Sequence, residues 1–244
     1  LRGRAVGIAG DAGLLARGMD YGDRFAILLR NHPQFIELMI AASLTGLVFV
    51  PIDPRTRGQK LAFTLKDSGC RGIVCADYNL AQVAEVRGQI PSLDWVWVLD
   101  AGEEVGAMPT GELTDATSLF EVLDRPQTWV DMRLRHPDDA LQIIYTSGTT
   151  GDPKGVVFGN ARYGGATMLS ALLGIADDER PYTGLSLTHG NAQLMTLASA
   201  LRVGQRAVFS RKFTKSRLWD ITRQYGCTFF NLLGGMATAI YSEP

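Results

Sequence analysis

The segment YTSGTTGDPKGVV, from Tyr145 to Val157, is the most distinctive stretch of the chain. Positions 146–155 hold three glycines, four hydroxyl residues, one proline and one lysine. Glycine and proline are poor in the interior of helices and strands, so this composition predicts a loop. The apolar run 139–147 predicts a strand that leads into the loop, and 155–158 predicts a strand that leaves it. A flexible linker is the plain alternative, but a linker has no use for an embedded Pro-Lys-Gly.

Such a loop has the chemistry of a polyphosphate site. Glycines let several backbone N–H groups converge on one ligand, the hydroxyls add donors, and Lys154 adds a mobile positive charge. A preceding strand would place the loop at a strand's carboxyl end, where α/β sheets bind ligands. The loop does not match a Walker A pattern, because Pro153 precedes the lysine and Gly155 follows it.

The rest of the chain predicts an α/β fold with a largely parallel, doubly wound sheet. Short apolar runs alternate with longer stretches of helical periodicity. Expected strands lie at 24–29, 47–52, 70–76, 94–100, 182–187, 206–211 and 227–234, and expected helices at 31–46, 57–69, 79–90, 119–123, 160–174, 190–204 and 214–226. Residues 101–117 are polar and are expected to form a surface loop. No composition shift marks an internal boundary.

The bulk composition excludes several classes of function. The 244 residues carry a formal net charge of -1, so no nucleic-acid partner is indicated. The most apolar stretch, 35–52, contains Glu37, Gly46 and Pro51, and we do not expect a membrane span. Three cysteines, irregularly spaced, predict neither disulfides nor a zinc site, and a cytoplasmic location fits best. Cys70 and Cys75 are expected in the core.

One histidine stands out as a candidate site residue. His189 follows an apolar run and precedes a predicted helix, whereas His32 and His136 each precede a proline and are expected in loops. His189 either contacts substrate or only begins a helix. Asn191 is a weaker candidate, since asparagine is common as a helix N-cap.

A cluster of four basic residues in seven lies at 211–217, in the sequence RKFTKSR. A solvated helix entrance is the favoured interpretation. Contact with CoA phosphates or with a neighbouring domain is the alternative.

The loop resembles the phosphate-binding signature of the adenylate-forming superfamily, which includes acyl- and aryl-CoA synthetases, luciferases and adenylation domains of peptide synthetases. The segments 44–75 and 185–235 resemble the sequences upstream and downstream of that signature. The downstream segment is closest to CoA ligases related to crotonobetaine/carnitine-CoA ligase. The resemblance implies that the chain is part of the large N-terminal domain, with 1–244 as a partial AMP-binding domain.

The resemblance also implies roles for individual residues. The loop would wrap the β- and γ-phosphates of ATP, with binding residues Thr146, Ser147, Gly148, Thr149, Thr150, Gly151, Lys154 and Gly155. Lys154 would also be catalytic, as would His189 beside the acyl carboxylate. The implied substrates are a small-molecule carboxylic acid, ATP and CoA, with Mg²⁺ on the triphosphate and no metal ligand expected within this chain. A homodimer is left open.

Several motifs of the superfamily are not found in the sequence. There is no aromatic-Gly-X-Thr-Glu motif for Mg²⁺, and the only Thr-Gly-Asp lies inside the loop, at 150–152. Lys212 and Lys215 lie too early to be the superfamily's C-terminal catalytic lysine. The sequence therefore predicts an acyl-CoA ligase present as a fragment that does not turn over by itself. Loading of a carrier-protein thiol and a non-catalytic nucleotide-binding module are the alternatives.

Overall fold

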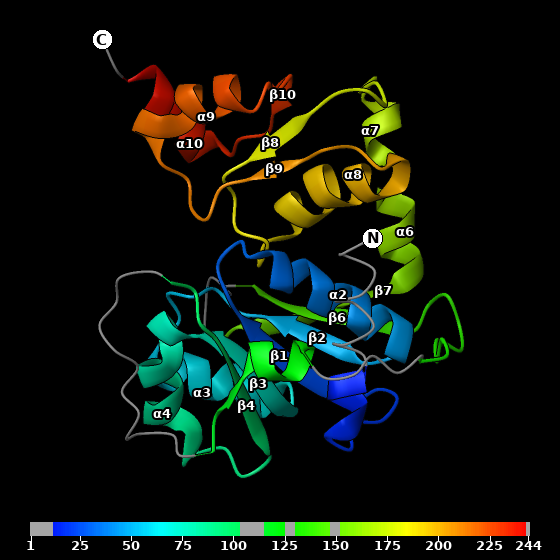
Figure 1. Cartoon of the computed structure of the whole chain (residues 1–244), viewed down its shortest axis with the longest axis vertical. Coiled ribbons are helices and arrows are strands. Elements are labelled where there is room, and N and C mark those ends of the chain that lie inside the picture. Colours follow the sequence, from blue (N-terminus) through cyan, green and yellow to red (C-terminus); the bar gives the residue numbers. More distant parts are fainter. Residues whose placement is uncertain (1–11, 103–114, 125–129, 147–151, 243–244) are drawn as a thin grey trace. The chain divides into compact units, whose positions relative to one another are not determined.

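The computed structural model describes residues 12–102, 115–124, 130–146 and 152–242 (Figure 1). The chain divides into two compact units, Leu1–Asn160 and Ala161–Pro244. Each unit has a sheet of its own. No shift in composition predicts this division.

The N-terminal unit is built on a seven-stranded sheet in the order β5-β4-β3-β1-β2-β6-β7. All neighbouring strands are parallel except β6 and β7, which are antiparallel. The strands are β1 (Arg24–Leu28), β2 (Val48–Pro51), β3 (Cys70–Ala76), β4 (Trp95–Leu99), β5 (Thr117–Ser118), β6 (Ala140–Thr146) and β7 (Lys154–Gly159). The largely parallel α/β sheet predicted from the sequence is confirmed. One detail differs, because Thr117, predicted in a loop, begins the short strand β5.

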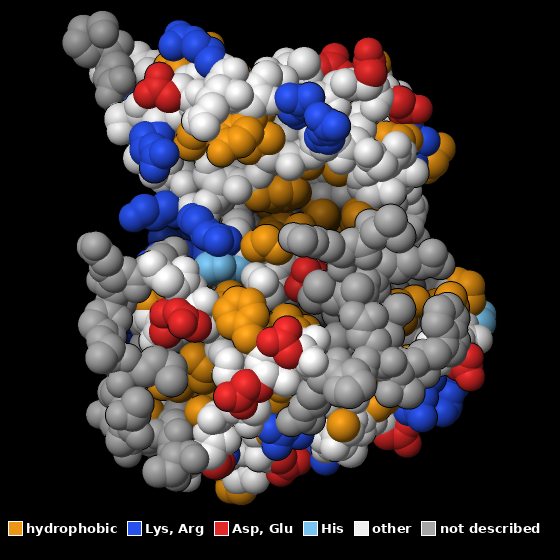
Figure 2. Space-filling model, in the orientation of Figure 1, with side chains coloured by type: hydrophobic (Ala, Val, Ile, Leu, Met, Phe, Trp, Pro, Cys, Tyr) orange, Lys and Arg blue, Asp and Glu red, His pale blue; other side chains and the backbone are white. Residues whose placement is uncertain are grey.

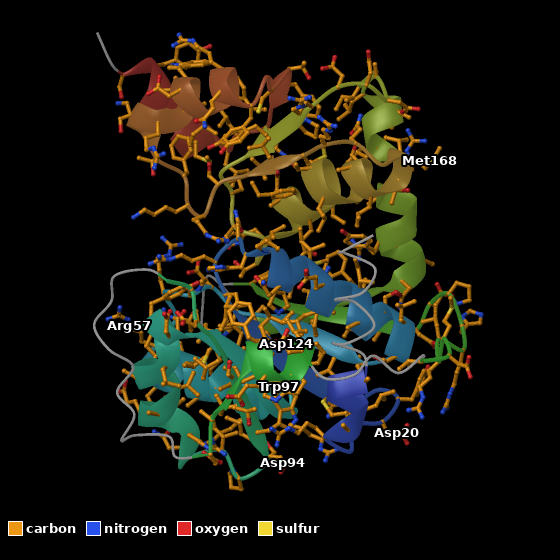
Figure 3. The ribbon with its side chains drawn as sticks, in the orientation of Figure 1. Asp20, Arg57, Asp94, Trp97, Asp124 and Met168 are labelled. Carbon is orange, nitrogen blue, oxygen red and sulfur yellow. The ribbon has the colours of Figure 1, made fainter. Side chains whose placement is uncertain are left out.

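Helices cover both faces of this sheet, as a doubly wound fold requires (Figure 1). The helices of the unit are one at 12–16, α2 (Pro33–Thr45), α3 (Gly58–Asp67), α4 (Leu80–Arg87) and α5 (Leu119–Leu123), with the 3₁₀ turn η1 (Asp77–Asn79) before α4. On one face, Leu61 and Leu65 of α3 pack in a buried cluster with Ile73 and Val96 of the strands. The other face is rich in aromatic rings, including Trp97, which is labelled in Figure 3.

Both ends of α2 are marked by residues that favour the start or the end of a helix. Pro33 lies in the first turn, where its missing N–H costs nothing, and Gly46 ends the helix with a φ of 72°. That left-handed conformation suits glycine. In addition, a Cβ at Gly46 would lie 2.6 Å from the ring of Tyr21.

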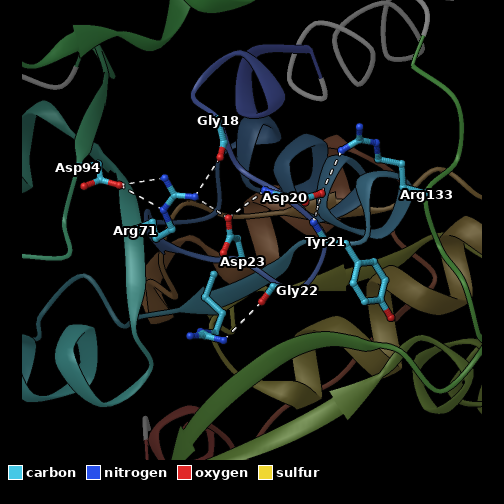
Figure 4. A network of polar contacts seen from close by, with 9 residues as sticks. Gly18, Asp20, Tyr21, Gly22, Asp23, Arg71, Asp94 and Arg133 are labelled. Carbon is cyan, nitrogen blue, oxygen red and sulfur yellow. Dashed lines mark hydrogen bonds and ion pairs between the residues drawn. The ribbon is translucent and has the colours of Figure 1, made fainter.

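A polar network ties together the beginnings of β1, β3 and β4 (Figure 4). The Arg71 guanidinium donates to Asp23 Oδ2 at 2.6 Å and to the carbonyl of Gly18 at 3.0 Å, and pairs with Asp94 at 3.2 Å. Its side chain is about one third exposed. The network joins residues that precede or begin three neighbouring strands and acts as a structural clamp.

Replacement of Arg71 by methionine is expected to lower the free energy of unfolding by about 1–3 kcal/mol, because three charge-assisted contacts are lost at once. Urea denaturation followed by circular dichroism measures this. Arg55→Met is the control, since the Arg55 side chain is 87% exposed and its ion pair among the described residues is with its near neighbour Asp53. That variant should change stability by less than about 0.5 kcal/mol. Equal effects of the two substitutions would contradict the clamp.

Glu37 of α2 is partly buried, and its Oε2 atom has no hydrogen-bond partner among the described residues. Burial raises the pKa of this carboxyl group above its ordinary value of 4.5. The folded state therefore holds the proton more tightly than the unfolded state, and stability is lost as the pH rises through the raised pKa. At neutral pH the charged Glu37 side chain destabilises the fold.

Glu37→Gln should consequently raise the free energy of unfolding at pH 7 by about 1 kcal/mol. The gain should vanish below about pH 4, where glutamate is protonated in both states. Thermal denaturation across pH 3–8 tests this, with exposed Glu85→Gln on α4 as the matched control. A gain that does not depend on pH would rule out this cause.

The C-terminal unit has a three-stranded parallel sheet in the order β10-β8-β9. Its elements are α6 (Asn160–Ala166, beginning one residue before the unit), α7 (Leu169–Leu172), β8 (Pro181–Thr183), the π-helix η2 (Ala192–Leu197), α8 (Ala198–Val203), β9 (Val208–Phe209), η3 (Lys215–Arg217), α9 (Leu218–Gln224), β10 (Phe229–Phe230) and α10 (Gly234–Tyr241). The strand predicted over 182–187 is shorter than expected. The helix predicted over 160–174 is interrupted after the Gly164–Gly165 pair, where Thr167 Oγ1 donates to the Gly164 carbonyl.

Three further observations bear on the predictions. Cys70, Cys75 and Cys227 are free thiols, and the first two are fully buried, as expected for core residues. Across the described ranges, no helix combines the length and apolarity needed to cross a membrane. His32 lies in the loop before α2, as predicted, but it is 2% exposed, and its Nε2 atom lies 3.1 Å from the Tyr78 hydroxyl.

Candidate functional site

The predicted loop joins the two antiparallel strands β6 and β7. The structure describes three of the eight predicted binding residues: Thr146, the last residue of β6, and Lys154 and Gly155, the first two of β7. Thr146 pairs directly with Lys154, and both side chains are exposed. The other five (Ser147, Gly148, Thr149, Thr150 and Gly151) lie outside the described residues. The strand pairing therefore fixes the backbone on both sides of the loop.

Packing requires glycine at position 155, the second residue of β7. It pairs with Tyr145 across the two strands. A Cβ at this position would lie 2.9 Å from Ile143 Cγ2 and 3.2 Å from Tyr145 Cζ. The aromatic ring of Tyr145 thus lies against the bare backbone of Gly155. This contact could not be predicted from the sequence, where Gly155 indicates only phosphate binding.

Tyr145 is bound by a residue of α3, a helix distant from it in the sequence. Its hydroxyl donates a hydrogen bond of 2.5 Å to Asp67 Oδ2, on the last residue of α3. Burial, with the Asp67 carboxylate second, raises the pKa of the Tyr145 phenol, which keeps it protonated and able to donate. Tyr145 begins the glycine-rich motif, but its residue type alone predicts no role in the site. An aromatic residue at the end of a strand offers no sign of a partner 78 positions away.

His189 lies in a tight turn of the C-terminal unit, between β8 and η2. The backbone N–H of His189 donates to the Ser186 carbonyl at 3.0 Å, and the hydroxyls of Ser186 and Thr188 lie 2.8 Å apart. Buried Gln193 holds the turn from beneath, with its Nε2 donating to the Leu187 carbonyl at 2.6 Å. The His189 side chain is exposed. The turn therefore presents this imidazole from a rigid backbone.

Asn191 does not act as the N-cap that the alternative interpretation required. It has helical dihedral angles and makes no side-chain capping hydrogen bond to η2. Its Oδ1 atom is buried and has no partner within the described ranges. A π-helix follows it directly, and such helices are rare and frequently found at functional sites. These observations favour Asn191 as a site residue.

The basic segment 211–217 forms part of a pocket. The predicted helix entrance is present, as η3 leading into α9, and Arg211, Lys212 and Arg217 are exposed. The same three residues line a pocket of about 640 Å³ together with Thr214 and Tyr225. Figure 2 shows lysine and arginine side chains at the surface of this unit. The pocket keeps the alternative of a phosphate contact open.

The two candidate catalytic residues belong to different units. Lys154 lies in the N-terminal unit and His189 in the C-terminal unit. In the part of the chain that the structure describes, no three histidine, cysteine or acidic side chains are placed to hold a metal ion. These residues therefore provide no Mg²⁺ cage.

The sequence matches the profile of the AMP-binding enzymes over residues 11–244. The chain belongs to this family. The match covers both units and the whole of the glycine-rich loop. The resemblance seen in the loop and its flanking segments is confirmed.

Relatives of the chain include acyl-CoA ligases. It is 30% identical over 233 residues to long-chain fatty acid transport protein 1 of Homo sapiens, covering 93% of this chain and 35% of that protein. It is 29% identical to crotonobetaine/carnitine–CoA ligase of Salmonella paratyphi A, covering 93% of this chain and 43% of that protein. The chain thus spans less than half the length of these relatives.

The fold of the chain is shared with solved acyl-CoA ligases. The structure of a long-chain-fatty-acid-CoA ligase from Archaeoglobus fulgidus superimposes with a TM-score of 0.84 at 21% identity, covering 98% of this chain and 46% of that one. The predicted fold class, that of an adenylate-forming enzyme's N-terminal part, is therefore confirmed.

Proposed function

We propose that the protein is an AMP-forming acyl-CoA ligase. It condenses a carboxylate with ATP to acyl-AMP and pyrophosphate, and then transfers the acyl group to the thiol of CoA. The observation that carries the proposal is the loop between β6 and β7, with Lys154 on its return strand, in a member of the AMP-binding family. We also propose that residues 1–244 are a partial AMP-binding domain, which needs the remaining motifs of the family for turnover.

The loop residues act by binding and by electrostatics. Backbone amides and hydroxyls of the loop bind the β- and γ-phosphates, the part that leaves as pyrophosphate. A carboxylate oxygen attacks the α-phosphorus, the bond to the β-phosphate oxygen breaks, and negative charge grows on the leaving group. The Lys154 ammonium stabilises that charge. His189 and Asn191 contact the acid substrate.

Mg²⁺ supplies charge neutralisation when it is bound to the triphosphate. The ion would be held in part by the phosphate oxygens. The described residues offer no group of three or more potential metal ligands.

CoA is the proposed acceptor because the relatives include CoA ligases. The basic pocket at Arg211, Lys212 and Arg217 has the charge to bind the phosphates of CoA. The alternatives are loading of a carrier-protein thiol and a non-catalytic nucleotide-binding module. The names of the relatives suggest a fatty acid or a carnitine-like acid as substrate.

The free cysteines support a cytoplasmic location, and a homodimer stays a prediction.

Carboxylate-dependent exchange of labelled pyrophosphate into ATP tests the proposal. The protein in its natural length is assayed with a panel of fatty, aryl and carnitine-like acids. Exchange with some acids, reduced in His189→Ala, supports adenylation, and CoA-dependent release of AMP then separates a CoA ligase from a carrier-loading enzyme. ATP binding without exchange for any acid would favour the non-catalytic module.

A further inference from the structure

The hydrogen bond between Tyr145 and Asp67 joins the loop to a helix in an unexpected way. Asp67 is the last residue of α3, and the C-terminus of a helix carries partial negative charge. A carboxylate is disfavoured at that position, so Asp67 weakens α3 locally. A residue that is unfavourable for its own helix frequently has a role in contacts outside that helix. Here the partner of the carboxylate is the Tyr145 hydroxyl, at 2.5 Å.

The helix end that carries Asp67 is itself firmly anchored. The next residue, Ser68, is buried, and its hydroxyl donates to the Thr64 carbonyl at 2.6 Å. The Ser68 Oγ atom also lies 3.2 Å from Cys70 Sγ, which is fully buried at the start of β3. Asp67 is therefore a fixed point, attached to the core of the unit.

Tyr145 connects Asp67 to the two strands that flank the loop. Its ring packs against the core cluster on the α3 side of the sheet. It also covers the backbone of Gly155, which follows Lys154, while Tyr145 itself precedes Thr146. One side chain thus contacts the strand that enters the loop, the strand that leaves it and the helix beneath.

We infer that Tyr145 and Asp67 are a positioning pair that fixes Thr146, Lys154 and Gly155, the residues on either side of the phosphate loop, by holding β6 and the start of β7 against α3. The inference rests on the proposed function for the ligand, a nucleoside triphosphate. Neither residue touches the reacting atoms, and the pair acts through the backbone of Thr146, Lys154 and Gly155.

The test uses Tyr145→Phe, which removes only the hydroxyl, Asp67→Asn, which removes the charge, and the double variant. ATP binding is measured by calorimetry, and backbone order by hydrogen exchange of residues 152–158. Tyr145→Phe should weaken ATP binding about three- to tenfold and speed exchange at these residues but not in β1. The double variant should bind ATP no more weakly than Tyr145→Phe alone, because both substitutions remove the same hydrogen bond.

Tyr78→Phe is the matched control. It also removes a hydroxyl from the same unit, one that accepts the Arg30 N–H at 2.9 Å, away from the strand pair β6–β7. This variant should leave exchange at 152–158 unchanged. Additive losses in the double variant, or unchanged exchange in Tyr145→Phe, would overturn the positioning pair. Absence of ATP binding in the unaltered protein would instead refute the proposed function, and hydrogen exchange would still decide whether the pair holds the strands.

Discussion

Pyrophosphate exchange is expected to fall by about 10²–10³-fold when Lys154 is replaced by alanine, the loss typical of one electrostatic group at a transition state. Lys154 is the first residue of β7 and pairs with Thr146 of β6, so its backbone is fixed on the return side of the loop. Its exposed ammonium is then available to the phosphates. Because charge on the leaving pyrophosphate grows during the reaction, kcat should fall more than the KM for ATP rises.

Two further variants make the Lys154 result specific. Lys154→Arg keeps the positive charge and should retain more exchange than the alanine variant. Lys60→Ala removes an exposed lysine from α3, and should exchange at the normal rate. All of these variants should unfold at the same temperature, since Lys154 is exposed. Undiminished exchange in Lys154→Ala would show that the loop lysine does not contribute to adenylation. The catalytic groups would then belong to the family's other motifs.

Much of the fold could be predicted because its signals are local. Gly46 and Gly69 mark helix ends at which φ is positive, and the apolar runs that form β1 to β4 have strand length. The strand order could not be predicted, since pairing of β2 with β6 joins Phe49 to Gln142 across a long stretch of sequence. The π-helix η2 was likewise missed, because its spacing of apolar residues resembles that of an α-helix.

The candidate site was predicted only where chemistry shows in residue type. Lys154 and the loop glycines predict phosphate binding from residue type alone, and His189 is a candidate from its place before a helix. The supporting contacts were not visible. The partner of Tyr145 is Asp67 and that of His32 is Tyr78, in each case far along the chain. Side chains at such separations are brought together by the packing of the sheet and its helices, which no local pattern encodes.

Gly72→Ala is expected to destabilise the N-terminal unit by about 3 kcal/mol, at the upper end of the usual cost of overpacking a core. Gly72 of β3 pairs directly with Trp95 of β4, whose indole lies across the bare backbone. An added Cβ would lie 1.9 Å from Trp95 Cε2 and 2.1 Å from Cζ2. The indole has no room to retreat, because it is 2% exposed and its ring centroid lies 4.5 Å from that of Trp97.

Urea denaturation, followed by tryptophan fluorescence and circular dichroism, measures the loss in Gly72→Ala. Gly88→Ala is the matched control: Gly88 follows α4 with a φ of −60°, and nothing lies within 4 Å of an added Cβ. That variant should be neutral or gain about 0.5 kcal/mol, since alanine restricts the unfolded chain. Similar stability of the two variants would show that the sheet yields at β3 and β4. A severe loss in Gly72→Ala alone would show that the Trp95 ring fixes the spacing of these strands, and with it the sheet to which the β6–β7 loop is attached.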